Sequence, residues 1–328
     1  MEDESGGPHA YHLVVRAMED RAGIDPGTRF ALALRHAVAG HMPHPRYREA
    51  AIERRRAGAG AQSVERSVAD WMSTDLNPLV RALSSLRSPS NAIWAFNAYN
   101  RHAGLGARTS IEETSSEGGA GRIARRESRV ATADPELCAV GTVSAFDRVL
   151  SIASRNRSRA DATAPGILEV GRLLGVEASA SFHVAEAMAG HERVDLERVA
   201  RHLGASRRSL QRRLAEESTS FEAIRAAARI VAATDALRGE ASLTEVAWSC
   251  GFSDLPHMSR AIKAACGMTP ALLRAILRGG AEPEADVSPQ APGFPRRDWR
   301  EGSMDSASPK ATILAEPASS RANERRDG

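Results

Sequence analysis

The stretch Ser206–Leu214, SRRSLQRRL, contains four arginines and two leucines within nine residues. Wound as an α-helix at about 100° per residue, it places Leu210 and Leu214 together on one face. The remaining surface carries long cationic and amide side chains, namely Arg207, Arg208, Gln211, Arg212 and Arg213. Such a helix buries its leucines against its own domain and holds its polar side chains outward. The pattern indicates a helix shaped to enter a groove.

The residues before this stretch complete a helix-turn-helix pattern. Leu196–His202 is a short amphipathic segment, and a tight turn at residues 203–205 separates it from Ser206, a typical N-cap residue. Ala200 lies four residues before Gly204, where a small side chain lets two helices approach closely. Glycine tolerates the left-handed backbone that such a turn requires.

The same pattern recurs 47 residues downstream, where Ala247 and Gly251 occupy the positions of Ala200 and Gly204. One such pattern is a weak signal because amphipathic helix pairs are common in helical cores, but two in one short segment are specific. The expected turn and packing positions of the two units are Ala200, Gly204, Leu210, Ala247, Gly251, Phe252, Met258 and Ile262. Residues 221–238 predict one alanine-rich connecting helix, about 27 Å long. That length suits two recognition helices roughly one DNA turn, about 34 Å, apart.

Residues 192–278 resemble the DNA-binding domain of AraC/XylS-type transcription regulators. The resemblance is carried by Val199–Ser206, Leu210–Leu214, Thr219–Phe221, Val246–Ala247, Gly251–Asp254, Ser259–Lys263 and Gly267–Pro270. It covers about a quarter of the chain. The resemblance implies two helix-turn-helix units, joined by a long helix, that bind successive major-groove segments of promoter DNA.

In the first unit, the resemblance implies base or phosphate contacts by Arg208, Gln211 and Arg212. Arginine can read guanine with two hydrogen bonds, and glutamine can read adenine. Arg207 and Arg213 lie on the flanks of the predicted helix, so we expect them to contact phosphate. The full set expected at DNA in this unit is Ser206, Arg207, Arg208, Gln211, Arg212 and Arg213.

The second unit departs from the family pattern, because Leu255 and Pro256 stand where many members have polar side chains. Neither side chain can donate a hydrogen bond, although Leu255 can contact a thymine methyl group. Pro256 is compatible with the first turn of a helix that Ser253 caps. The residues expected at DNA are His257, Ser259, Arg260 and Lys263. We therefore expect the first unit to recognise the DNA base sequence and the second mainly to bind the phosphate backbone of the DNA.

The preceding residues alternate short amphipathic stretches with Gly, Pro and Ser breaks. Apolar spacing predicts helices over residues 11–22, 28–39, 46–57, 63–72, 77–86, 91–102, 167–174 and 182–188. Another helix is expected to begin with Asp134 as its N-cap and Pro135 in its first turn, and to end near residue 154. Residues 109–114 and 122–130 predict two strands around a glycine-rich turn. The expected fold is mainly α, with an α-rich or α+β regulatory domain where many family members carry a β-rich barrel.

The chain of 328 residues is long enough for two domains with separate cores. We expect a disordered N-terminus at 1–10, an effector-binding or dimerisation domain at 11–190, the DNA-binding domain at 191–278 and a disordered tail at 279–328. Residues 191–278 contain 14 basic and 10 acidic residues, a net charge of +4 against +3 for the whole chain. The expected partners are double-stranded promoter DNA and an unidentified small-molecule effector, with RNA polymerase and a second copy of the chain as further candidates.

The sequence also sets expectations for location and cofactors. Cys138, Cys250 and Cys266 form no CxxC pair, which favours a reducing compartment and hence the cytoplasm. No apolar run approaches the roughly 18 residues of a membrane helix. His9, His12, His41 and His44 have spacings that could serve a metal, but we interpret them as surface or loop residues because no cysteine or carboxylate cluster accompanies them. We expect no cofactor, no metal and no membrane partner.

Three alternatives concern the N-terminal half. The aromatic residues Trp71, Trp94, Phe96 and Tyr99 could line an effector pocket, although such spacing is more often ordinary core. A ligand-independent regulator would use this half only to dimerise or to bind another protein. A DNA-repair enzyme would use a methyl-accepting cysteine, but Cys138 lies in an apolar run typical of a buried core position. We therefore expect a regulator without enzymatic activity.

Overall fold

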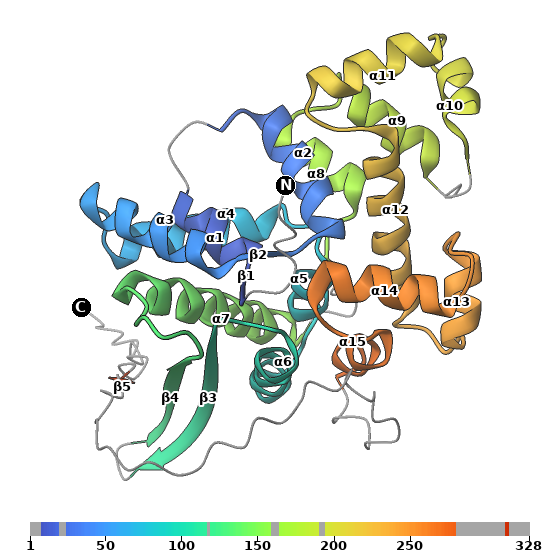
Figure 1. Ribbon diagram of the computed structural model, residues 1–328. Coiled ribbons are helices and arrows are strands. Elements are labelled where there is room, and N and C mark those ends of the chain that lie inside the picture. The colour runs from blue at the N-terminus through green and yellow to red at the C-terminus, as the bar shows by residue number, and fades with distance from the viewer. Residues whose placement is uncertain are drawn as a thin grey trace, which may run out of the picture.

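The computed structural model describes residues 8–19, 24–116, 119–158, 164–189, 194–279 and 312–314, which are mainly helical as the sequence predicts (Figure 1). The helices before residue 190 are α1 (His12–Glu19), α2 (Pro26–Val38), α3 (His44–Arg56), α4 (Ala61–Ser73), α5 (Pro78–Ser84), α6 (Pro89–His102), α7 (Glu136–Asn156), α8 (Ile167–Leu174) and α9 (Ala180–Met188). The later helices are α10 (Leu196–His202), α11 (Arg207–Glu216), α12 (Phe221–Ala236), α13 (Leu243–Ser249), α14 (Leu255–Cys266) and α15 (Pro270–Leu277).

Local signals explain several helix starts. Asp25 and Asn77 cap α2 and α5 by accepting hydrogen bonds from backbone N–H groups, and proline occupies the first turn of both helices. The start of α7 differs from the prediction, because Pro135 is its N-cap and no side chain caps it. Asp134 instead accepts hydrogen bonds from His44 and Arg126. Two cationic or hydrogen-bonding partners hold this carboxylate away from the helix end.

Two small sheets accompany the helices. Strand β1 (His9–Tyr11) pairs antiparallel with β2 (His41–Pro43), so His9 and Ala10 are ordered rather than part of a loose N-terminus. Strands β3 (Ala107–Ser116) and β4 (Gly119–Ser128) form the predicted hairpin, from the pair Ala107 and Ser128 to the pair Ser116 and Gly119. In the expected tail, β5 (Thr312–Leu314) pairs with β4, and residues 280–311 and 315–328 lie outside the described residues.

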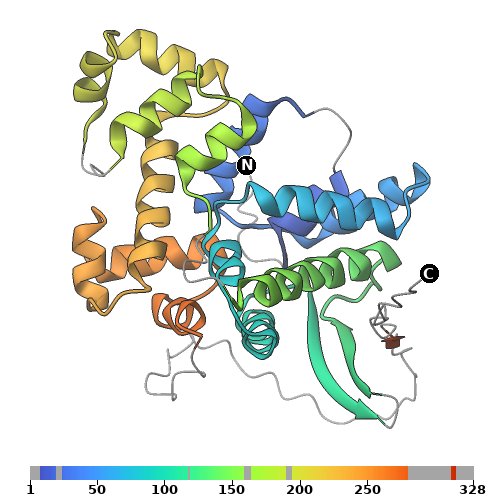
Figure 2. The same cartoon turned by 180° about the vertical axis from the view of Figure 1, so that it is seen from behind.

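Helix α12 connects the two helix-turn-helix units. It has 16 residues, two fewer than predicted, and is therefore about 24 Å long. Figure 1 shows α11 near one end of α12 and α13, α14 and α15 near the other end. The same arrangement is visible from behind in Figure 2, where the β3–β4 hairpin extends away from the helices.

The protein has two hydrophobic cores, but they do not follow the expected domain boundary near residue 190. One core joins α1 and α3–α7 to the second half of α12 and to α13–α15. The other joins α2 to α8–α11 and to the first half of α12. Helix α2 packs extensively against α12, and Phe30 and Leu34 on α2 are fully buried, as is Ile224 on α12. Both halves of the chain therefore contribute to each core.

Helix α7 occupies nearly the predicted residues and is the most apolar long helix among the described residues. An 18-residue window in it has a mean hydropathy of 1.3, which meets the composition of a membrane-spanning helix. The window is not a continuous apolar run, since Asp147 and Arg148 lie within the helix. Leu137, Phe146 and Val149 are buried, and α7 packs against α1, α3, α4, α5 and α6. We interpret α7 as a core helix of the N-terminal half.

Candidate nucleic-acid interface

The first turn, between α10 and α11, is closed by backbone hydrogen bonds around a left-handed glycine. The backbone N–H of Ala205 donates to the carbonyl oxygen of Ala200 (2.9 Å), and that of Leu203 donates to Val199 (3.0 Å). Gly204 has φ +62°. A left-handed backbone conformation is unfavourable for residues with a Cβ, so glycine is the residue best suited to this position.

The second turn, between α13 and α14, repeats this geometry residue for residue. The backbone N–H of Phe252 donates to the carbonyl oxygen of Ala247 (2.9 Å), and that of Cys250 donates to Val246 (3.0 Å). Gly251 has φ +79°. The 47-residue repeat in the sequence therefore corresponds to two turns with the same hydrogen-bonding pattern.

Buried side chains fix both recognition helices to the protein. On α11, Leu210 and Leu214 are 2% and 0% exposed. The remaining expected packing side chains are also buried, namely Ala200, Ala247, Phe252, Met258 and Ile262. The end of α11 is held by Glu217, whose carboxylate accepts hydrogen bonds from the backbone N–H groups of Ala180 (2.7 Å) and Ser181 (2.8 Å) at the start of α9. Helix α11 is thus positioned by packing on one face and by a side-chain contact at its end.

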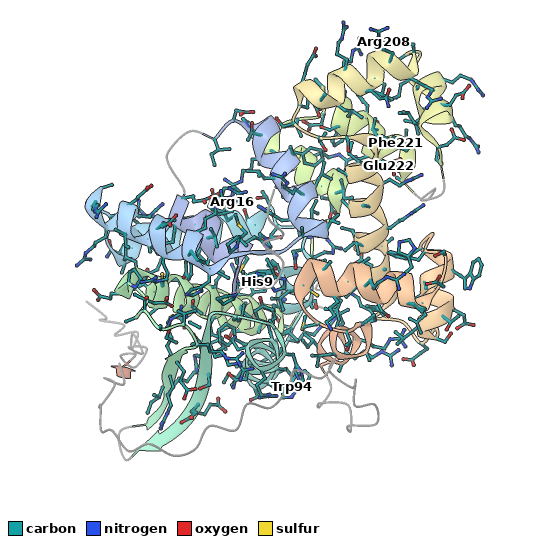
Figure 3. The ribbon with its side chains drawn as sticks, viewed as in Figure 1. His9, Arg16, Trp94, Arg208, Phe221 and Glu222 are labelled. Atoms are coloured by element: carbon teal, nitrogen blue, oxygen red, sulfur yellow. The ribbon has the colours of Figure 1, made fainter. Side chains whose placement is uncertain are left out.

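The opposite face of α11 is open to solvent. Its exposed side chains are Arg207, Arg208, Gln211, Arg212 and Arg213. Figure 3 shows Arg208 on the outer side of this helix, away from the rest of the protein. Arg212 lies 3.7 Å from Glu216 in an exposed pair, which contributes little stability and leaves the guanidinium free to change partner. Ser206 also has a structural role, because its hydroxyl accepts a hydrogen bond from Ser209 N–H (3.1 Å) and caps the helix.

Helix α14 begins one residue later than the expected cap implies. Asp254, rather than Ser253, is the N-cap, and its carboxylate accepts a hydrogen bond from the backbone N–H of His257 (2.6 Å). That hydrogen bond lowers the pKa of Asp254. The Ser253 hydroxyl instead lies 3.0 Å from Nδ1 of His257. Asp254 replaces serine here because its carboxylate reaches the free N–H group and complements the positive end of the helix dipole.

The solvent-facing side of α14 is less polar than that of α11. Arg260 and Lys263 are exposed, whereas His257 and Ser259 are half-buried. The ring of His257 packs edge-on against Phe252, with 5.3 Å between ring centroids. Leu255 packs partly against the first core. Two of the four side chains expected at DNA in this unit, Arg260 and Lys263, are therefore exposed.

The interpretation of the histidines as surface or loop residues is wrong for two of them. His12 is 1% exposed, and its Nε2 lies 2.6 Å from a carboxylate oxygen of Asp75. His44 is 2% exposed, and its Nε2 lies 2.8 Å from Asp134. Although burial alone would raise it, the pKa of Asp134 is lowered by the His44 hydrogen bond and by Arg126. Among the residues described, no group of three or more His, Cys, Asp or Glu side chains could hold a metal ion.

The remaining candidates of the N-terminal half lie in its core. Cys138 is fully buried, and burial raises the pKa of its thiol to about 12, which is the reverse of an activated thiolate. Trp71, Phe96 and Tyr99 are buried, and Trp94 is half-buried. Phe96 and Tyr99 also line a cavity of about 70 Å³.

A family model described as a helix-turn-helix domain matches residues 199–276, from α10 to α15. The C-terminal part of the chain is an AraC-type helix-turn-helix domain. The match spans both turns, both recognition helices and α12. An AraC-type helix-turn-helix domain is a DNA-binding domain of transcription regulators, so residues 199–276 form the DNA-binding part of this protein.

Two further comparisons add no functional detail to the AraC-type assignment. The crystal structure of the transcriptional regulator CdpR from Pseudomonas aeruginosa is 15% identical and aligns with 78% of this chain and 99% of its own, with a TM-score of 0.23. That score is too low to compare the two folds. No curated protein matched the chain.

Proposed function

We propose that the protein recognises a specific promoter sequence asymmetrically and responds to a small-molecule effector in its N-terminal half. In this proposal, α11 reads bases in one major-groove segment, and α14 mainly holds the phosphate backbone in the next. Promoter DNA is the principal partner, RNA polymerase and a second copy of the chain are further partners, and the cytoplasm is the site of action.

The exposed face of α11 is the observation that carries the proposal. It offers four guanidinium groups and one amide, and these are the groups that hydrogen-bond to guanine and adenine edges. The corresponding face of α14 offers only Arg260 and Lys263 as exposed cations, and Leu255 and Pro256 occupy its first turn. Two exposed cations, with only the half-buried Ser259 hydroxyl beside them, favour phosphate contact over base reading.

The two cores support control by the N-terminal half. Because α2 and α5 pack against α12 and α14, a change in the N-terminal half alters the surroundings of the DNA-binding helices. A regulator with an independent DNA-binding domain would lack such contacts. Through these shared cores, an effector bound in the N-terminal half can change the affinity of the DNA-binding helices for DNA.

Selection of a preferred site from random DNA by the full-length protein, followed by affinity measurements on single-base variants, tests this proposal. Changes under α11 should cost about 1–3 kcal/mol per base pair, and changes under α14 should cost clearly less. Arg208→Ala should relax discrimination at one base pair, whereas Arg260→Ala should weaken all sequences similarly. Equal costs under both helices would contradict the asymmetry, and the lack of any preferred site would contradict the proposal as a whole.

A further inference from the structure

The cavity of about 70 Å³ in the N-terminal half lies between α1, α3, α5, α6 and α7. Its walls are mainly apolar and include Leu13, Val14, Leu79, Leu83, Phe96 and Val149. Several elements of the N-terminal half line this partly open cavity, so a bound molecule would contact several helices at once.

Most polar groups in the cavity wall have partners within the protein, and Nε of Arg126 is a buried donor without one. The Tyr47 hydroxyl donates to the carbonyl oxygen of Cys138 (2.6 Å), and the amide of Asn100 bonds to the backbone of Thr109 and Phe96. His44 and Arg126 both hydrogen-bond to Asp134, whose single negative charge balances that of the Arg126 guanidinium. A charged ligand would lose its hydration without gaining an unpaired counter-ion. The wall therefore favours an uncharged, largely apolar molecule.

The size of the cavity constrains how it can respond. Its volume is about half that of an apolar cavity of roughly 150 Å³ known to bind benzene. A ligand of benzene size must therefore move part of the wall outward. Helix α5 has only seven residues, three of which, Leu79, Val80 and Leu83, face the cavity.

Arg81 connects α5 to the helix that joins the two DNA-binding units. This side chain is 1% exposed, and its Nη2 donates to both carboxylate oxygens of Asp235 near the end of α12 (2.7 and 2.8 Å). Its Nη1 donates to the carbonyl oxygen of Pro165. Because a buried guanidinium without its partner is costly, α5 and the end of α12 must move together.

Asn77, the N-cap of α5, connects the cavity to the second recognition helix. Its Oδ1 accepts hydrogen bonds from Leu79 N–H (3.0 Å) and from the hydroxyl of Tyr11 (2.8 Å), and Tyr11 lines the cavity. Its Nδ2 donates to the carbonyl oxygens of Ala265 in the last turn of α14 (2.7 Å) and of His36 in α2 (2.7 Å). One buried amide thus joins the cavity wall, α2 and α14.

We propose that the cavity binds a compact, uncharged, largely apolar molecule, and that α5 transmits its presence to α12 through Arg81 and to α14 through Asn77. The inference rests on the proposed function, since it specifies the effector class and the route by which the effector acts. A larger hollow beside α1 and α3 has a volume of about 570 Å³ and is lined by Glu19, Glu53 and Arg54 among others. It is a weaker candidate, because its walls come from elements that pack little against α12 or α14.

Benzene and benzoate are suitable probes, because they share a ring and differ in charge. Binding to the full-length protein is measured by thermal shift, and affinity for the selected DNA site is measured with and without each probe. We expect benzene to raise the melting temperature reproducibly and to change DNA affinity at least about fivefold, the lower range of allosteric coupling. Benzoate should do neither. Equal stabilisation by both probes, or by neither, would overturn the assigned ligand class.

Two pairs of variants locate the site and the route. Ala145→Met fills the cavity from α7, and Ala139→Met adds the same side chain on the same helix outside the cavity wall. Only Ala145→Met should abolish the benzene-dependent thermal shift. Asp235→Asn weakens the contact with Arg81, whereas Glu222→Gln, on the same helix, removes only an exposed pair with Arg225. Asp235→Asn should still bind benzene, but the change that benzene causes in the logarithm of DNA affinity should fall by at least half. Glu222→Gln should keep both benzene binding and the full change in DNA affinity.

The outcomes separate this inference from the proposed function. If the probe-free protein has no preferred DNA site, the proposed function fails, and the thermal shift still reports whether the cavity binds benzene. If the protein recognises DNA normally but benzene causes no shift, the inference is overturned alone. Equal coupling in Asp235→Asn and Glu222→Gln would overturn the route through α5.

Discussion

The arginines on the flanks of α11 provide the sharpest test of how the protein binds DNA. Arg207 and Arg213 are both exposed, and we expect them to contact phosphates rather than bases. The double substitution Arg207→Gln with Arg213→Gln removes two charges without altering the buried leucines. It should therefore weaken the salt dependence of binding and leave sequence discrimination nearly unchanged.

The magnitude follows from counter-ion release. Each phosphate contact contributes about 0.9 to the slope of log affinity against log salt concentration, so two contacts contribute about 1.8. Between about 50 and 200 mM salt, a fourfold increase, these two contacts account for about a twelvefold loss of affinity. The double variant should therefore lose about twelvefold less affinity over that range than the original protein.

Fluorescence anisotropy with the selected site and with a scrambled site measures both quantities. Arg55→Gln with Arg56→Gln on α3 is a matched control, because these exposed arginines lie on a helix outside the AraC-type domain. The control should retain the original slope. An unchanged slope in the Arg207 and Arg213 variant, with its fold verified, would refute phosphate contact by these side chains. A selective loss of discrimination would show instead that they read bases.

Two further predictions concern stability and its dependence on pH. A Cβ added at Gly204 would meet no atom within 4 Å, so Gly204→Ala should lower the free energy of unfolding only by the cost of a left-handed backbone, about 1–2 kcal/mol. Gly204→Asn should lower it by less, because asparagine adopts this conformation more readily. Equal losses for the two variants in urea unfolding would contradict this explanation. Burial, with His9 and His12 nearby, lowers the pKa of His41 from 6.5 to about 4. Its contribution to stability is therefore fully present above pH 6.5 and is lost as the pH falls toward 4, on the order of 3 kcal/mol. His41→Asn should flatten the unfolding free energy over that range, and a slope as steep as the original would contradict the assignment.

Local patterns in the sequence predict most of the helices well. Residues 167–174 and 196–202 form helices with the predicted bounds, because apolar spacing and nearby cap residues act within a few positions. The repeated Ala and Gly positions also predict the two turns of the DNA-binding domain. These features depend on interactions between residues close in the sequence, which a single chain reveals directly.

Long-range polar contacts could not be predicted in this way. The Asn77 amide meets a carbonyl 188 residues away, and Arg81 meets a carboxylate 154 residues away. The helix start at Asn77 and Pro78 is visible in the sequence, but its role between α2 and α14 is not. The same limit explains the misassigned histidines, because their burial and carboxylate partners depend on distant elements.

The packing of α2 along α12 has a consequence for engineering. A fragment cut near residue 190 would lose the cover provided by Phe30 and Leu34 and leave apolar surface of α12 in water. Transplanting the DNA-binding segment onto another sensor would require grafting the α2 surface with it. Under the proposed function, the DNA specificity of this protein is therefore better changed by exchanging side chains on α11 than by exchanging the whole DNA-binding segment.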